Sequence, residues 1–192
     1  MDAKLLGRAT LDEILQRVDE DLAAQARSAG CRCGGRLHSA VYPRKPRGGP
    51  TGLGAGYEHR LSYCCAEDGC RRRTTPPSVR FLGRKVYLGA VVVLVSALRQ
   101  GPSPTRVRVL YELFGVGERT LRRWRQWWQK SFTEGSFWRA AQGRFMPALT
   151  AGELPGAMAA RFGAHAIDGL CRLLRFLSPI TTGSCTLSGG GF

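Results

Sequence analysis

Acidic residues are scarce in this chain, and long apolar runs are absent from it. The 192 residues include only 14 Asp and Glu against 29 Lys and Arg, which gives a net charge of +15. The longest apolar block runs from Val86 to Leu98, whereas a membrane-spanning helix needs ~20 apolar residues. Residues 1–30 are charged and amphipathic, unlike the apolar core of a signal peptide. We therefore expect a cytoplasmic protein with no membrane partner.

The charge imbalance is confined to residues 31–150. This region holds 22 Lys and Arg, 19 of them Arg, against six Asp and Glu, whereas the flanking segments are nearly neutral. Such a field attracts polyanions over a long range and is hard to explain for an enzyme that acts on a small molecule. The guanidinium group also suits bidentate contact with phosphate and with guanine. A nucleic acid is therefore the expected partner.

Two cysteine clusters indicate a metal site. Cys31 and Cys33 precede two glycines, and a second cluster about thirty residues later ends at Cys70. In a reducing cytoplasm clustered thiols are more often metal ligands than disulfides, and four thiolates on two turns suit tetrahedral Zn²⁺. The spacing favours Cys65 as the fourth ligand because it gives the shorter loop, with Cys64 as the alternative.

The expected zinc site is structural. Four thiolates leave no open position for water, which a catalytic zinc requires. The segments 36–42 and 57–63 between the clusters alternate in a strand-like way, so the sequence predicts a zinc ribbon over residues 31–80. His38 and His59 lie in these segments and are alternative ligands, although a histidine on a strand is more often a surface residue.

Residues 104–130 predict two helices joined by a short turn. Ser103 and Pro104 suit a helix start, and Gly115 is suited to end that helix with a positive φ. Val116 is then expected to point inward and Gly117 to cap the next helix. In the second helix apolar residues recur at helical spacing, which predicts one buried stripe made of Leu121, Trp124 and Trp128.

The opposite side of this second helix, residues 118–130, is cationic. Five of its thirteen positions are Arg or Lys. The pattern favours a helix-turn-helix with 118–130 as the recognition helix, although arginines on an outer face are often simply solvated. The residues expected to face DNA here are Glu118, Arg119, Thr120, Arg122, Arg123 and Gln126.

Two further basic segments are expected to contact phosphates. A loop rich in Pro and Gly between the predicted strands carries Arg44, Lys45 and Arg47. The run from Arg71 to Arg73, which includes Arg72, directly follows Cys70, so a bound metal would hold it rigidly.

The remaining chain is expected to be mostly helical. The predicted class is α+β, mostly α, with a small zinc ribbon followed by a three-helix domain. A capping box at Thr10 and Glu13 predicts an amphipathic helix over 11–28. Other helices are expected over 81–99 (where 91–95 also suits a strand), 154–162 and 167–177, with a disordered tail from Ser178. The expected domains are 1–30, 31–80, 81–130 and 131–192.

The order of these motifs resembles a known family. Cys31-Arg-Cys33-Gly-Gly, Cys65 with Gly69-Cys70-Arg-Arg-Arg73, and Phe114-Gly-Val-Gly-Glu-Arg-Thr-Leu-Arg-Arg-Trp124 are similar to motifs in the zinc-ribbon plus helix-turn-helix proteins of bacterial insertion sequences and transposons. The CxC differs from the family's usual CxxC. The resemblance covers about 31–130 and implies a DNA-binding module carried by a mobile element, either the front end of a transposase or a separate accessory and regulatory protein. We expect it to be nucleoid-associated and to bind double-stranded DNA, with a transposase or recombinase as a candidate partner and a homodimer as a candidate assembly.

Catalysis is not expected. A transposase needs a ribonuclease-H-like domain with three metal-binding carboxylates, and beyond residue 130 the only acids are Glu134, Glu153 and Asp168. We expect a regulator or transposition accessory protein. The alternative is an RNA- or single-strand-binding ribbon protein in which Tyr42 and Trp127 would stack on bases.

Overall fold

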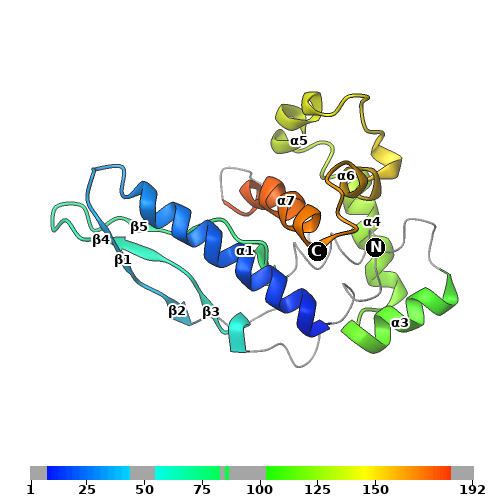
Figure 1. The fold of residues 1–192 in the computed structure, drawn as a ribbon, viewed down its shortest axis with the longest axis horizontal. Coiled ribbons are helices and arrows are strands. Elements are labelled where there is room, and N and C mark those ends of the chain that lie inside the picture. The colour runs from blue at the N-terminus through cyan, green and yellow to red at the C-terminus, as the bar shows by residue number, and fades with distance from the viewer. Residues whose placement is uncertain (1–7, 44–54, 83–84, 87–102, 183–192) are drawn as a thin grey trace.

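The computed structural model describes residues 8–43, 55–82, 85–86 and 103–182, which form an α+β fold (Figure 1). The helices of the described part include α1 (Arg8–Ala29), α3 (Pro104–Phe114), α4 (Glu118–Gln129), α5 (Ser136–Ala141), α6 (Gly156–Arg161) and α7 (Ile167–Leu177). Short 3-10 turns are η2 (Ala55–Tyr57), η3 (Gln142–Arg144), η4 (Ala151–Glu153) and η5 (Ser178–Thr181).

Short antiparallel strands form three small sheets. The largest has the order β1-β4-β5, with Leu37 opposite Cys65 and His38 opposite Cys64. The other two are the pairs β2-β3 and β6-β7. The strands are β1 (Leu37–Ser39), β2 (Tyr42–Pro43), β3 (His59–Arg60), β4 (Tyr63–Cys65), β5 (Arg73–Thr74), β6 (Phe81–Leu82) and β7 (Lys85–Val86).

Helix α1 is long and runs beside the small strands on one side and beside α7 on the other (Figure 1). Its apolar residues recur at helical spacing and are buried, as the pattern predicts: Leu11, Ile14, Leu15, Val18 and Leu22. The predicted N-cap is wrong, because the helix already includes Thr10 and extends back to Arg8. The helix ends at Ala29, two residues before Cys31.

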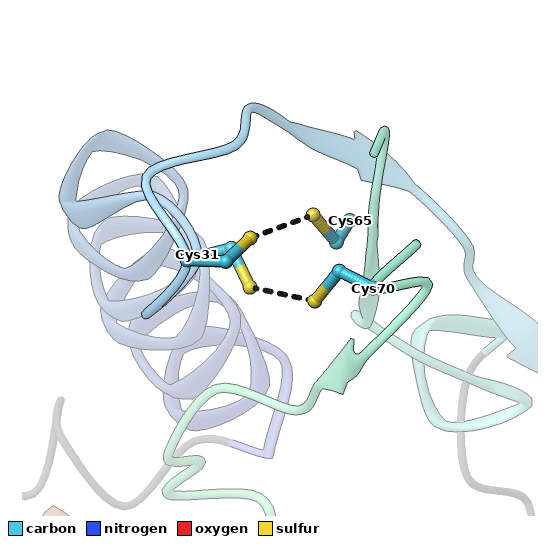
Figure 2. Close-up of side chains that lie close together, drawn as sticks. Cys31, Cys65 and Cys70 are labelled. Carbon is cyan, nitrogen blue, oxygen red and sulfur yellow. Dashed lines mark hydrogen bonds between the residues drawn. The ribbon is translucent and has the colours of Figure 1, made fainter. Parts of the chain in front are cut away.

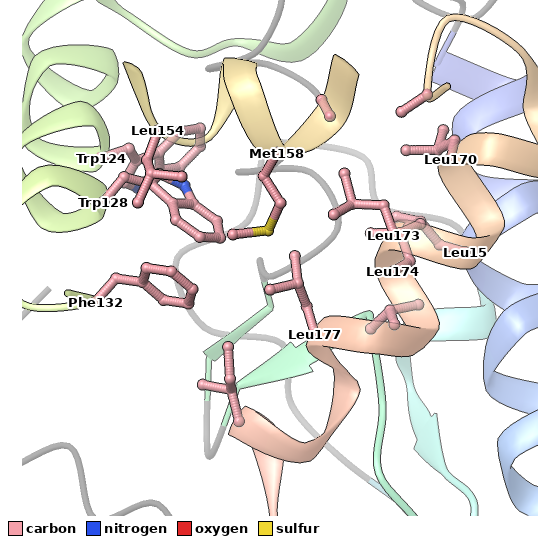
Figure 3. Packing of buried hydrophobic residues seen from close by; sticks show 14 of the residues in the cluster. Leu15, Trp124, Trp128, Phe132, Leu154, Met158, Leu170, Leu173, Leu174 and Leu177 are labelled. Atoms are coloured by element: carbon pink, nitrogen blue, oxygen red, sulfur yellow. The ribbon is translucent and has the colours of Figure 1, made fainter. Parts of the chain in front are cut away.

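One large hydrophobic cluster joins α1 to the helices at the other end of the chain. Helix α7 lies between α1 and the α4–α6 region, with Leu173 and Leu177 fully buried (Figure 3). Trp128 and Met158 are also fully buried and reach the same cluster from α4 and α6. The pairing of α1 with α7 is a contact between residues about 150 positions apart, which helical periodicity alone does not reveal.

A buried carboxylate joins α1 to the segment that follows the sheet. Asp19 accepts hydrogen bonds from the Ser78 hydroxyl (2.6 Å), the Val79 amide (2.6 Å) and Arg80 Nε (2.8 Å). The side chains of Asp19 and Arg80 are only 5% and 6% exposed. The Ser78 amide in turn donates to Thr181 Oγ1 at 2.9 Å, so the C-terminal turn η5 is held by the same segment.

Two predicted segments differ from the observed structure. The expected helix over 81–99 begins instead with the strands β6 and β7, which pair antiparallel with Phe81 opposite Val86, and the rest of that prediction lies outside the described residues. Residues from Ser178 were expected to be disordered, but Ser178–Thr181 form a 3-10 turn whose Ile180 is buried in the large cluster. The predicted helices at 154–162 and 167–177 are confirmed as α6 and α7.

Among the described helices, none combines the length and the apolar character that crossing a bilayer requires.

The Asp19 contacts make a testable prediction about stability. Asp19→Ala removes the charge partner of the buried Arg80 guanidinium and should lower the free energy of unfolding by about 3–5 kcal/mol. The matched control is Asp21→Ala, two residues further along α1. Asp21 pairs with Arg175, but the two side chains are 44% and 38% exposed, so the expected loss is about 0–1 kcal/mol. Urea unfolding of the metal-loaded proteins measures both, and equal losses would contradict the role of Asp19.

Candidate functional site

Four cysteines from two turns meet at one point beyond the end of α1. The Sγ atoms of Cys31, Cys33, Cys65 and Cys70 all lie within 4.8 Å of one another. Figure 2 shows Cys31, at the end of α1, facing Cys65 and Cys70 across the gap. The closest pairs are Cys33–Cys65 at 3.5 Å and Cys31–Cys70 at 3.7 Å. A tetrahedron with metal–sulfur bonds of about 2.3 Å has sulfur–sulfur edges of about 3.8 Å, so the cluster could hold a metal ion.

The first turn is built by backbone hydrogen bonds around the CxC motif. The Gly34 amide donates to the Cys31 carbonyl at 2.8 Å, and the Cys31 amide donates to the Gly35 carbonyl at 3.0 Å. This tight loop brings Cys31 and Cys33 to the same side although only one residue separates them. The unusual CxC spacing is therefore compatible with a shared site.

The second turn follows strand β4. The Cys70 and Arg71 amides both donate to the Glu67 carbonyl at 3.0 Å, which closes the loop between Cys65 and Cys70. Arg71 has a φ of 43°, a left-handed conformation that is uncommon for a residue other than glycine. The Cys65 amide donates to the Arg72 carbonyl at 3.0 Å, so the loop returns beside the strand from which it leaves.

Strand alternation decides between Cys64 and Cys65. Successive side chains on a strand point to opposite faces, so only one of the two can reach the other cysteines. Cys65 is fully buried within the cluster, whereas the Cys64 thiol donates to the Arg71 carbonyl at 3.4 Å and is not in the group. The alternative ligands His38 and His59 are exposed and also lie outside the group. Cys171 is buried in the large hydrophobic cluster.

Gly35 has no side chain, and this leaves room for the sulfur atom of Cys65. A Cβ at this position would lie 2.5 Å from the Glu67 side chain and 2.8 Å from Cys65 Sγ. Such distances are below van der Waals contact, so any larger residue would displace the Glu67 side chain and the Cys65 sulfur. The functional importance of Gly35 was not predicted individually, because the sequence shows a glycine after the cysteines but not what approaches it.

The thiols differ in acidity. The backbone amide of Cys33, which hydrogen-bonds to the Cys31 sulfur, is the main reason that the pKa of Cys31 is lowered to about 7. The Glu67 amide acts on Cys65 in the same direction, but burial and the neighbouring thiols outweigh it and raise the pKa of Cys65 to about 12. Metal binding requires all four thiolates, so protons compete with the metal and acidification should release it.

Arginines surround the cysteine cluster on the surface. We call the exposed residues Arg32, Arg36, Arg71, Arg72 and Arg73 the thiol-site arginines. The Arg71 guanidinium pairs with Asp68, and Arg73 lies over the Tyr42 ring at 5.6 Å. Arg32 and Arg36 were not among the predicted contact residues, although their positions beside Cys31 and Cys33 were a usable signal.

Helices α3 and α4 form the predicted pair with a three-residue turn. Gly115 has a φ of 65°, and its amide donates to the Tyr111 carbonyl at 2.8 Å, which ends α3 as expected. Val116 is buried, and the Gly117 carbonyl accepts the Thr120 amide at 3.0 Å at the start of α4. In α3 the side chain of Leu110 is buried, whereas Tyr111 is 60% exposed.

Helix α4 has one buried and one charged face. The buried face includes the predicted Leu121, Trp124 and Trp128, and also Trp127, which is only 9% exposed. The proposed stacking of bases on Trp127 is therefore wrong, because this ring packs against Phe132 in the core. Thr120 is only partly exposed and lies on the flank of the helix. The exposed side chains are Glu118, Arg119, Arg122, Arg123, Arg125 and Gln126.

All of the exposed side chains of α4 except Arg125 were among the residues predicted to face DNA. We call Arg119, Arg122, Arg123 and Gln126 the α4 cationic face. Arg122 donates to Glu118 at 2.6 Å within the helix. The predicted contact residues Arg44, Lys45 and Arg47 lie outside the described residues. Between α3 and the start of α4 an open groove of about 440 Å³ is lined by Pro104, Val107, Arg108, Tyr111, Gly117 and Glu118.

Comparison with known proteins gives no relative. No family model matches the chain, and neither a curated protein nor a solved structure is significantly similar to it.

The close contact at Gly35 makes a prediction about metal affinity. Gly35→Ala should weaken metal binding by about tenfold or more, because the added Cβ displaces Cys65 Sγ and the Glu67 turn. The control is Gly69→Ala in the second turn, where a Cβ would meet no heavy atom within 4 Å. Competition with a chromophoric chelator measures both affinities. Wild-type affinity in Gly35→Ala would show that the turns do not need this close approach.

Proposed function

We propose that this chain is a zinc-stabilised protein that binds double-stranded DNA in a sequence-specific manner through α4. The observation that carries the proposal is the division of α4 into two faces. Three tryptophans and Leu121 anchor the helix in the core, while the α4 cationic face is exposed along the opposite side. A short helix fixed in this way can enter the major groove and place arginines against guanine edges.

Zinc is the metal that suits the site best. Four thiolates within 4.8 Å are soft ligands, and their number fills the tetrahedral coordination of Zn²⁺. The small sheet has few buried apolar residues of its own, so a metal would contribute to its stability. The ion is assigned a structural role because no coordination position is left for a substrate.

The broader role follows the motif order. Two cysteine turns followed by a helix-turn-helix with a cationic second helix resemble the DNA-binding proteins of bacterial insertion sequences and transposons. We propose an accessory or regulatory role in such an element, without catalysis and with a transposase or recombinase as partner. We also propose that the chain forms a homodimer, which its mass in solution would test. A transposase or recombinase gene beside this one in the genome would support the role.

Single-strand or RNA binding is the weaker candidate. It depended on aromatic side chains available for stacking, and Trp127 is buried. Tyr42 is partly exposed, but its ring is already covered by Arg73 at 5.6 Å. Competition of duplex and single-stranded DNA for the same protein distinguishes the two candidates.

The zinc assignment predicts a defined metal content. The purified protein should contain about one zinc per chain, and strong chelation should remove the metal and unfold residues 31–73. Cys65→Ser should abolish stoichiometric zinc, whereas the neighbouring Cys64→Ser should retain it, because only the Cys65 sulfur reaches the cluster. Elemental analysis after gel filtration measures the content. A metal-free protein with an unchanged fold would contradict the assignment.

The α4 assignment predicts a loss of sequence discrimination. On a duplex selected from a random library, Arg122→Ala or Arg123→Ala should each cost about 1–3 kcal/mol of binding free energy, and much less on random DNA. Arg144→Ala is the control, since it removes the same charge from an exposed position outside α4. Fluorescence anisotropy on both duplexes gives the comparison. Equal losses on the selected and random duplexes would mean that α4 is a basic surface helix that does not recognise sequence.

A further inference from the structure

The two arginine-rich regions lie at opposite ends of the molecule. The turn between β4 and β5, which carries Cys70 and the following arginines, lies at the far left of Figure 1, while α3 and α4 lie at the right. Helix α1 runs between them and ends at Ala29, directly before the metal-binding turn. The thiol-site arginines and the α4 cationic face are thus separated along the direction of α1.

The length of α1 sets the scale of this separation. Its 22 residues span about 33 Å at a rise of 1.5 Å per residue. One turn of B-form DNA is about 34–36 Å long. A separation on the order of the length of α1 is therefore close to one turn of a duplex.

The separation is fixed by contacts on both sides of α1. Toward the metal site, Ala23 of α1 packs with Cys31, Leu37 and Tyr63 in a small hydrophobic cluster. Near the opposite end, the Tyr57 hydroxyl donates to Asp12 at 2.8 Å.

Midway, the buried Asp19–Arg80 pair holds the segment after β5 against α1. Arg80 also donates to the Gly56 carbonyl at 2.6 Å, which ties that same segment to η2. On the side of the helices, α1 packs on α7, and Trp128 of α4 belongs to the same cluster. These contacts make α1 a rigid spacer rather than a flexible linker.

We propose that one molecule contacts a single DNA duplex at two places about one helical turn apart, with α4 in a groove and the thiol-site arginines on the phosphate backbone. This inference rests on the proposed DNA-binding function and deepens it, because it fixes the length of DNA that the protein needs. A duplex shorter than one turn meets only one region, whereas a duplex of about two turns meets both.

A competing role for the thiol-site arginines is local charge compensation. Four thiolates and one Zn²⁺ carry a net charge of −2, which surrounding guanidinium groups would stabilise. In that case neutralising these arginines would weaken metal binding instead of DNA binding. The two roles are separated by measuring metal content and DNA affinity on the same variants.

The test compares random-sequence duplexes of 10 and 24 base pairs over a range of salt concentrations. The variant is Arg72→Gln with Arg73→Gln, which leaves the left-handed Arg71 in place. The expected result is a fall of about 1.8 in the salt slope on 24 base pairs, because each lost phosphate contact removes about 0.9 from the slope, and no fall on 10 base pairs. The matched variant is Arg122→Gln with Arg123→Gln in α4, whose smaller effect on these random sequences should be the same at both lengths.

Each other outcome overturns the inference. Equal slope changes at both lengths would place the thiol-site arginines beside α4 on the DNA, and no change at either length would mean that they do not touch it. Loss of bound zinc from the Arg72→Gln, Arg73→Gln variant would assign these residues to the metal site. If the wild-type protein binds neither duplex, the proposed DNA-binding function itself fails. If it binds both duplexes with the same salt slope, DNA binding stands and only the two-point contact fails.

Discussion

The structure depends on one buried carboxylate, because an ionised side chain withdrawn from water must be matched by donors on all sides. Asp19 receives a hydroxyl, a backbone amide and a guanidinium nitrogen, and all three come from the consecutive residues Ser78, Val79 and Arg80. Leaving the Asp19 carboxylate or the Arg80 guanidinium buried and unpaired would cost a large free energy, so the segment has one favourable position on α1. Through Thr181 the same segment also positions the end of the helical part.

The cluster of four cysteines depends on its neighbours. Among the described residues, the hydrophobic cluster around it has five buried members, Ala23, Cys31, Leu37, Tyr63 and Cys65, which are few for a sheet of short strands. In the proposed function, a metal ion and the last turns of α1 supply what the sheet lacks. Displacing α1 would then move Cys31, and losing the metal would free the end of α1.

Helix α4 shows how a stable anchor can serve an exposed face. Trp124, Trp127 and Trp128 give the helix a rigid base, and Trp128 contacts Phe132 with ring centroids 4.4 Å apart. The backbone positions of the arginines on the opposite face are then fixed by this anchor, and their exposed side chains make no contribution to the core. In the proposed function this rigidity limits the conformational entropy lost on binding DNA.

The sequence by itself determined the local features, because each depends on neighbours along the chain. The amphipathic faces of α1 and α4, the turn at Gly115, the concentration of arginine and the two cysteine clusters were all evident from spacing. Only the tertiary structure decided which of Cys64 and Cys65 joins the cluster, because strand register sets the face of each side chain. It also decided that Trp127 is buried, where its ring packs against Phe132, and that β6 and β7 pair where a helix was expected, with β6 in contact with η5 far along the chain. The role of Asp19 was invisible for the same reason: its three donors lie about 60 residues away, and nothing in the local sequence marks it as different from Asp21.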